Sequence, residues 1–213
     1  MFNITEIVQN FIVLFTAITV HEYSHGFIAN LLGDPTAKSM GRLTLNPLAH
    51  LDPLGALMMI FCRFGWARPV PVNPYYFDDP KKDMVLVAFA GPASNLLLAF
   101  IVATIYPFLL VLNPAIFGLT TFFGGLFIAC IMVNISFAVF NLIPFPPLDG
   151  SKILFSVLPN SAYNKLLTYE RYGTFALLLL SFTGILGKIL NIIINPVADL
   201  YFRWINFLLS IIL

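Results

Sequence analysis

Charged residues are scarce in this sequence, and their scarcity excludes a water-soluble fold. Only 10% of the 213 residues are Asp, Glu, Lys or Arg, and 59% are hydrophobic. A typical soluble domain carries about 25% charged residues. With a mean hydropathy of +0.90, the chain has too little polar surface to cover its apolar side chains in water. We therefore expect a polytopic membrane protein that forms a single domain over residues 1–213.

Basic excess and cysteine pairs are also missing. The net charge is +1, so there is no electrostatic reason to expect a nucleic-acid partner. Cys62 and Cys130 are far apart and neither belongs to a Cys-x-x-Cys pair, which argues against a disulfide framework or a cysteine-based zinc site. The first eleven residues contain no Lys or Arg, so we expect a retained span there rather than a cleaved signal.

Long apolar runs, separated by Asn, Gly and Pro, predict the helices. A transmembrane helix needs about 20 mostly apolar residues. A shorter apolar run at 198–213 carries Asp199 and Arg203, which favour a partly interfacial position. The sequence thus predicts an all-α fold with four to five transmembrane helices, at about residues 4–32, 84–112, 121–143, 172–194 and, for the short one, 198–213.

A segment rich in proline and glycine follows the first predicted helix, from about residue 34 to residue 83. Its runs RLTL (42–45) and ARPVPVNPYYF (67–77) favour extended backbone, because prolines at this spacing oppose a helix. The run LGALMMIFCRFGW (54–66) is apolar but too short to cross a bilayer. We expect short strands here, with an element that dips into the membrane where protein or a watery cavity supplies its hydrogen bonds.

The positive charges predict the orientation in a cell membrane. Of the eleven Lys and Arg residues, six lie in residues 34–83 and three in residues 152–171, whereas residues 113–120 contain none. The positive-inside rule places the two basic stretches in the cytoplasm and the N-terminus outside. The cytoplasmic ends of the first and third predicted helices then carry His21, His25 and Asp149.

The strongest local motif is HEYSH at 21–25, inside the first predicted helix. Positions i and i+4 share a helix face, so His21 and His25 can reach one metal ion. Glu22 is one position along, where its carboxylate can act as general base towards a water on zinc. Chance matches to this motif occur in soluble helices, but ionisable groups within a span are costly without a partner, which favours a metal.

A catalytic zinc site has three protein ligands and an open position, so one ligand is still to be found. Asp149 in NLIPFPPLDG (141–150) is a candidate, because prolines and a glycine break the helix around it. The same carboxylate could instead cap a helix that begins at the following SKILFSVL, and the local sequence does not decide between the two roles. The competing positions lie among the charges of the long segment, at Asp52, Asp78, Asp79, Asp83 and His50, the last being expected as a hydrogen-bonded loop residue.

Three motifs, taken in this order, resemble the site-2 protease family of intramembrane zinc metalloproteases. They are HEYSH at 21–25, AGPASN at 90–95 and NLIPFPPLDG at 141–150, and GRLTLNPLAHLDPLG at 41–55 also resembles the stretch that follows the first motif in that family. The resemblance covers about residues 15–155. The sequence shows neither the PDZ domain nor the nucleotide-binding domain of larger relatives, so we expect a minimal form.

The resemblance implies one Zn²⁺ per chain, held by His21, His25 and Asp149, with Glu22 as the general base. It also implies that Asn141 orients the substrate or stabilises the oxyanion, although an amide at this position can also cap a helix end. We expect the AGPASN motif, including Asn95, to brace close helix packing rather than to take part in the chemistry.

The implied function is hydrolysis of peptide bonds within or near transmembrane segments of membrane proteins, as in regulated intramembrane proteolysis. The expected partners are transmembrane protein substrates and the lipid bilayer. Two alternatives remain at this stage. A zinc-binding membrane transporter also needs His and Asp in its spans but does not need Glu22, and a pseudoprotease would bind membrane proteins without cutting them.

Overall fold

The computed structural model describes residues 4–55, 67–156, 158 and 172–213, most of them helical. Within these ranges, four helices are long and apolar enough to cross a membrane. They confirm the all-α polytopic membrane fold that the composition predicts. In chain order they are α1 (Ile4–Leu31), α5 (Pro80–Leu112), α7 (Phe122–Asn141) and α10 (Ile185–Ile212).

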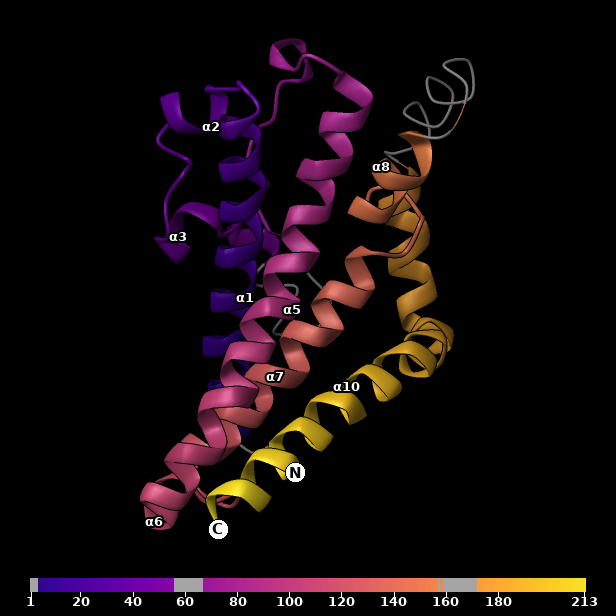
Figure 1. The fold of residues 1–213 in the computed structure, drawn as a ribbon. Coiled ribbons are helices and arrows are strands. Elements are labelled where there is room, and N and C mark those ends of the chain that lie inside the picture. Colours follow the sequence, from indigo (N-terminus) through magenta and orange to yellow (C-terminus); the bar gives the residue numbers. More distant parts are fainter. Residues whose placement is uncertain (1–3, 56–66, 157, 159–171) are drawn as a thin grey trace.

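Short helices connect the long ones. The turns α2 (Thr36–Ser39), α3 (Pro47–His50) and the 3₁₀ turn η1 (Pro74–Tyr76) follow α1. Beyond α5 come α6 (Pro114–Phe117), α8 (Asp149–Ser156) after α7, and an apolar helix at Tyr172–Phe182. Figure 1 shows α2 and α8 at one end of the molecule, and α6 with both chain termini at the opposite end. The long helices therefore define two ends that an apolar middle separates.

Helix α5 lies at the centre of the fold and contacts α1, α7, α8 and α10. Small, fully buried residues allow its neighbours to come close: Ala17 and Ala29 on α1, and Ala99 and Ala103 on α5. Ala99 and Ala103 belong to a hydrophobic cluster that joins α5, α7 and α10 around Tyr106. This packing fixes α1, α5 and α7 against one another, and all three contribute to the site described below.

The end of α1 is tied to the far end of the segment that follows it. Gly33 has a φ of +98°, a conformation that glycine adopts without strain. Asp34 is fully buried, and its carboxylate accepts hydrogen bonds from the backbone N–H groups of Thr36 (2.9 Å) and Asn73 (2.7 Å). The side chain of Asp34 therefore joins residues 34–36 to residue 73, so that the two ends of this stretch lie together at the α2 end of the molecule.

The short strands expected in this segment are reduced to a single isolated antiparallel bridge in the described range, between Leu51 and Ala67. Residues 42–45 and 67–73 are not helical, as the prolines predict. Pro69 and Pro71 also lack the N–H groups that a strand ladder needs, which explains why no further pairing follows Ala67 in residues 68–73. The apolar run that we expect to dip into the membrane lies largely in residues 56–66, outside the described residues.

The break near the C-terminus differs from the prediction. Asn195-Pro196 was expected to end one helix, but α10 runs through Pro196 and the break falls at Gly184, where φ is +71°. A proline removes only one backbone donor, which membrane helices tolerate, whereas a left-handed glycine redirects the chain. Residues 172–212 therefore follow one bent path from the α8 end to the α6 end (Figure 1), not two separate crossings.

Candidate active site

Two buried histidines lie one turn apart on α1. His21 is 2% exposed and His25 is 8% exposed, and their ring centroids are 4.6 Å apart. Both rings face α5, where Val87, Gly91 and Asn95 follow one another at intervals of four and so share a helix face. The same-face placement predicted from the HEYSH motif is the one observed.

Asp149 reaches these histidines from 128 residues further along the chain. Its carboxylate oxygen Oδ2 lies 3.1 Å from Nε2 of His21 and 3.1 Å from Nε2 of His25. The helix α7 ends at Asn141, and α8 begins at Asp149 after the proline-rich turn. A Cβ atom at Gly150 would lie 2.2 Å from the carbonyl oxygen of Leu142. Glycine is therefore needed for α8 to fold back on the end of α7 and aim Asp149 inward.

The three side chains fit a zinc ion. Their candidate ligand atoms all lie within 4.8 Å of one another, and tetrahedral zinc with bonds of 2.0–2.1 Å holds neighbouring ligand atoms about 3.3 Å apart. Nδ1 of His25 lies 2.7 Å from the carbonyl oxygen of Val87. That oxygen only accepts, so Nδ1 carries the proton and Nε2 presents its lone pair to the site.

Lys152 adds a positive charge beside the cluster. Its ammonium lies 3.3 Å from Oδ1 of Asp149, the carboxylate oxygen that does not face the histidines. The positive charge of Lys152 favours the ionised form of the Asp149 carboxyl over its protonated form. The carboxylate is thus kept in the ionised form that binds metal.

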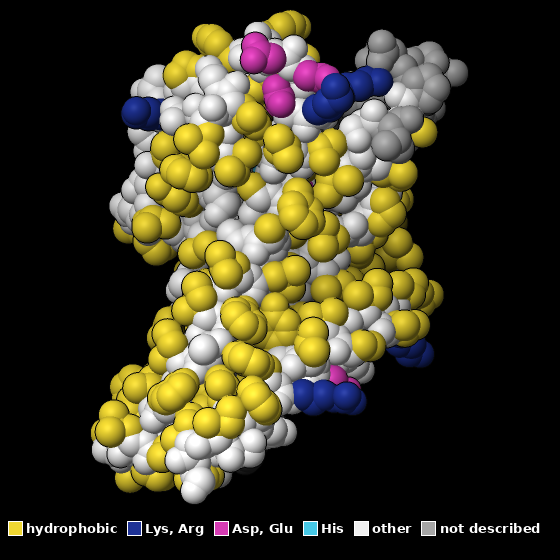
Figure 2. Space-filling view, viewed as in Figure 1, with side chains coloured by type: hydrophobic (Ala, Val, Ile, Leu, Met, Phe, Trp, Pro, Cys, Tyr) yellow, Lys and Arg dark blue, Asp and Glu magenta, His cyan; other side chains and the backbone are white. Residues whose placement is uncertain are grey.

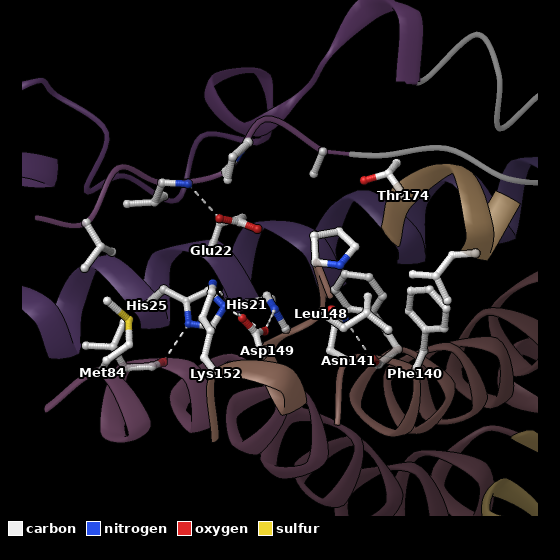
Figure 3. Close-up of a pocket in the computed structure, with 18 residues that line it drawn as sticks. His21, Glu22, His25, Met84, Phe140, Asn141, Leu148, Asp149, Lys152 and Thr174 are labelled. Atoms are coloured by element: carbon white, nitrogen blue, oxygen red, sulfur yellow. Dashed lines mark hydrogen bonds and ion pairs between the residues drawn. The ribbon is translucent and has the colours of Figure 1, made fainter. Parts of the chain in front are cut away.

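Glu22 lines a cavity of about 430 Å³. Its Oε2 accepts a 2.8 Å hydrogen bond from the backbone N–H of Val70, in the proline-rich strap formed by residues 67–73. Figure 3 shows Glu22 on the side of this strap, with the imidazoles and Asp149 beneath it. The cavity is lined by the metal cluster, by strap residues and by residues from α5, α7, α8 and the helix Tyr172–Phe182, including Met84, Phe137, Asn141, Lys152 and Thr174.

Asn141 lies in the last turn of α7 and lines the same cavity (Figure 3). It is 9% exposed, and its Nδ2 donates to the carbonyl of Phe137, 3.0 Å away. One amide proton therefore bonds to a carbonyl one turn back in its own helix, and the side chain still borders the cavity.

The AGPASN motif contributes more than packing, which the sequence reasoning missed. A Cβ atom at Gly91 would lie 2.6 Å from ring atoms of both histidines, so only glycine lets the imidazoles reach α5. Asn95 is fully buried, and its Oδ1 lies 2.7 Å from Nδ1 of His21. The signal was present in the sequence, because residues 91 and 95 share a helix face and a buried amide in a span needs a partner.

The competing candidates lie elsewhere. The carboxylate of Asp52 accepts a hydrogen bond from the N–H of Gly55. Asp79 is the N-cap of α5 and forms an ion pair with Lys82. His50 is the last residue of α3 and not a loop residue as expected, but it is hydrogen-bonded as expected, with its Nε2 2.8 Å from the carbonyl oxygen of Thr44. Among the described residues, His21, His25 and Asp149 form the one His/Cys/Asp/Glu group that could hold a metal. Cys130 is a free, half-buried thiol on α7, and Cys62 lies outside the described residues.

Comparison with known proteins agrees with this geometry. The model of peptidase family M50 matches residues 115–182. A protein of Bacillus subtilis named "Putative zinc metalloprotease YwhC" is 43% identical over 194 residues, which cover 88% of this chain and 86% of that protein. Rip2 of Mycolicibacterium smegmatis (28% identical, 81% of this chain and 66% of that protein) and MJ0611 of Methanocaldococcus jannaschii (28% identical, 72% of each) carry names of the same form. No solved structure matches this chain.

The chain belongs to peptidase family M50, the site-2 protease family. It is a zinc metalloprotease and a multi-pass membrane protein.

Proposed function

We propose that this protein hydrolyses peptide bonds within or beside the transmembrane segments of other membrane proteins, at one zinc ion held by His21, His25 and Asp149. One observation carries the proposal: the histidine pair and Glu22 project from α1, a helix apolar enough to cross a membrane. A hydrolytic site at that depth is suited to substrates that are themselves embedded in the bilayer. The proposed partners are therefore transmembrane protein substrates and the lipid bilayer.

Each residue has a distinct proposed role. Zinc, when bound, supplies Lewis-acid activation of water and of the scissile carbonyl. Glu22 accepts a proton from the attacking water and passes it to the leaving amine nitrogen, and the N–H of Val70 holds its carboxylate beside the cavity. Asn141 borders the cavity with one amide proton already bonded to Phe137, which leaves the second proton to donate to the substrate carbonyl oxygen.

We further propose that the protein lies in the cell membrane with its site towards the cytoplasm. Figure 2 shows acidic and basic side chains at the end that carries α2 and α8 and a second group in the lower half of the molecule, with hydrophobic side chains covering the middle between them. The α10 helix carries Lys188, Asp199 and Arg203. His21 and His25 lie past the midpoint of α1, nearer to the end that carries α2 and α8. The excess of Lys and Arg in residues 34–83 and 152–171 supports a cytoplasmic location for it.

The substrate is proposed to bind as an extended chain, because a helix hides its peptide bonds. Pro69, Val70 and Val72 of the strap line the cavity, but the strap's prolines lack the N–H groups that a strand ladder needs. Residues 42–45 are not helical, so this run can pair with an extended segment by strand addition. Proline substitutions along residues 42–45 test this pairing and should reduce cleavage while zinc content stays constant. Unchanged cleavage in all of them would contradict pairing at this run.

The Glu22→Gln variant tests the function. Wild type and variant are purified and incubated with model single-span substrates, and zinc is quantified in each. We expect equal zinc and a loss of cleavage of about 10²–10⁴-fold in the variant, the usual contribution of a general base. His25→Asn is the matched control, and it should lose zinc as well as activity.

Zinc flux into proteoliposomes separates the transporter alternative. Zinc flux that is equal in wild type and Glu22→Gln, together with no cleavage by either protein, would contradict the protease function and support a zinc transporter. A wild type that binds substrates without cutting them would instead indicate a pseudoprotease.

A further inference from the structure

A buried chain of polar side chains crosses three helices and ends at His21. Oδ1 of Asn95 lies 2.7 Å from Nδ1 of His21, and Nδ2 of Asn95 lies 2.8 Å from Oδ1 of Asn134 on α7. Both asparagines are fully buried. Two backbone carbonyls complete the chain: Nδ2 of Asn95 also bonds to the oxygen of Ala17 (3.0 Å), and Nδ2 of Asn134 bonds to that of Cys130 (2.8 Å).

The two carbonyls fix the direction of every hydrogen bond in this chain. A carbonyl oxygen only accepts, whereas an asparagine has one accepting oxygen and two donor protons. Asn134 must turn its NH₂ group to Cys130, so its oxygen faces Asn95. Asn95 then gives both protons away, to Ala17 and Asn134, and only its oxygen remains for His21.

The consequence reaches the metal site through the histidine tautomer. Because the oxygen of Asn95 accepts, Nδ1 of His21 must carry the proton. Nε2 of His21 is then unprotonated, and it lies 3.1 Å from Oδ2 of Asp149. His25 is fixed in the same way by a backbone carbonyl of α5. The asparagine chain thus fixes the proton on Nδ1 of His21, as the carbonyl of Val87 does for His25. Because asparagine is neutral, the chain adds no net charge inside the membrane.

We propose that Asn134 is a positioning residue that acts through Asn95 to hold His21 ready for zinc. This inference rests on the proposed function, because it concerns the same zinc site. Partners of metal-bound histidines set both the ring orientation and the tautomer. Asn134 touches none of the three proposed ligands directly, and its influence passes through one intermediate amide.

Zinc affinity of the purified full-length chain tests the proposal directly. The metal is removed with a chelator, and Zn²⁺ affinity is measured by competition with a chelating dye. We expect Asn95→Leu to weaken binding by about 10–100-fold, the usual effect of losing a histidine partner. Asn134→Leu should weaken binding less, by roughly three- to tenfold on the same basis, because the carbonyl of Ala17 still restrains Asn95.

Two further variants separate positioning from general destabilisation. Asn134→Asp keeps an oxygen that accepts from Asn95, and it should restore most of the affinity lost in Asn134→Leu. Tyr201→Phe is the matched control: it removes a partly buried interhelical hydrogen bond, from the Tyr201 hydroxyl to the carbonyl of Leu96, without touching the asparagine chain. We expect wild-type zinc affinity in Tyr201→Phe.

The visible absorption of the Co²⁺-substituted protein provides a readout that does not depend on activity. Asn95→Leu and Asn134→Leu should both alter the cobalt bands, because the orientation of His21 changes. Wild-type affinity together with wild-type cobalt bands in Asn134→Leu would overturn the inference. If Asn134→Leu does not fold, Asn134→Ala carries the same test. A wild type that binds no zinc would refute the proposed function itself, so the two failures are distinguishable.

Discussion

Gly91 is the residue at which the site is most sensitive to one added atom. A Cβ atom here would lie 2.6 Å from Cε1 and Nε2 of His21 and from Cε1 of His25. We expect Gly91→Ala to push both rings out of position and to abolish zinc binding and cleavage, with the helices intact. Elemental analysis and circular dichroism measure the two effects.

Gly187 is the control for this substitution. It lies in α10, and a Cβ atom there would meet no atom within 4 Å. Gly187→Ala should therefore leave zinc content and cleavage unchanged. A Gly91→Ala protein that keeps one zinc per chain and full activity would show that the imidazoles are placed differently from the arrangement described.

Val70 tests whether the strap holds the general base. Val70→Pro removes the N–H that donates to Glu22. We expect cleavage to fall by roughly tenfold or more, because a hydrogen bond to a charged group contributes about 1.5–3 kcal/mol. Zinc content should not change, since no proposed ligand is touched. Val70→Ala keeps the N–H and should retain most of the activity; an equal loss in both variants would assign the effect to packing.

At the scale of the element, the segment between α1 and α5 depends on one buried carboxylate. Asp34 accepts from the N–H groups of Thr36 and Asn73 and thereby joins the two ends of the segment. Asp34→Ala leaves both donors without this partner, and we expect a loss of about 1–3 kcal/mol in the free energy of unfolding. Thermal unfolding in detergent measures the loss, and limited proteolysis should show faster cutting within residues 35–79.

The control for Asp34 is Asp52→Ala. Asp52 is half-buried, and its carboxylate accepts from the N–H of Gly55, three residues away. Because that bond is local, its removal should leave the proteolysis of the segment near the wild-type rate. Equal protection of both variants from protease would contradict the closing role of Asp34.

The sequence predicts the first three long helices closely and the last one poorly. Predicted spans at 4–32, 84–112 and 121–143 correspond to α1, α5 and α7, because long apolar runs that end at Gly, Asn and Pro leave few alternatives. The break near the C-terminus was misplaced from Gly184 to Pro196. Proline is a strong signal in a soluble helix and a weaker one in a membrane, and the φ of Gly184 is a tertiary property that no local pattern encodes.

The site was predicted in part for a similar reason. His21, Glu22 and His25 stand within five residues, so helical spacing alone brings them together. Asp149 is 128 residues from His21, and its local sequence fitted a helix cap equally well. Asn134 was not singled out at all, since a lone amide in an apolar run has no periodicity. Its signal is the cost of an unpaired amide in a bilayer, which predicts an interior partner without naming it.

The whole molecule has two chemically distinct ends, and their assignment to the two sides of the membrane can be measured. In a protein with Cys62→Ser and Cys130→Ala, single cysteines are introduced as Lys38→Cys and Thr120→Cys, both at exposed positions. We expect a membrane-impermeant maleimide to label Thr120→Cys in intact cells and Lys38→Cys only after permeabilisation. The reverse pattern would place the site on the outer side and contradict the proposed orientation.

The positions of the three proposed ligands in the chain have a consequence for the protein during its synthesis. His21 and His25 belong to the first long helix, whereas Asp149 follows the third, so the ligand set is incomplete until about 150 residues have been synthesised. Metal binding contributes to the folding free energy only when all ligands are present. A nascent chain with one or two helices in the membrane has no complete ligand set. The protease therefore gains its activity only when synthesis has passed Asp149. Before that point, no separate inhibitor is needed to protect neighbouring membrane proteins from cleavage.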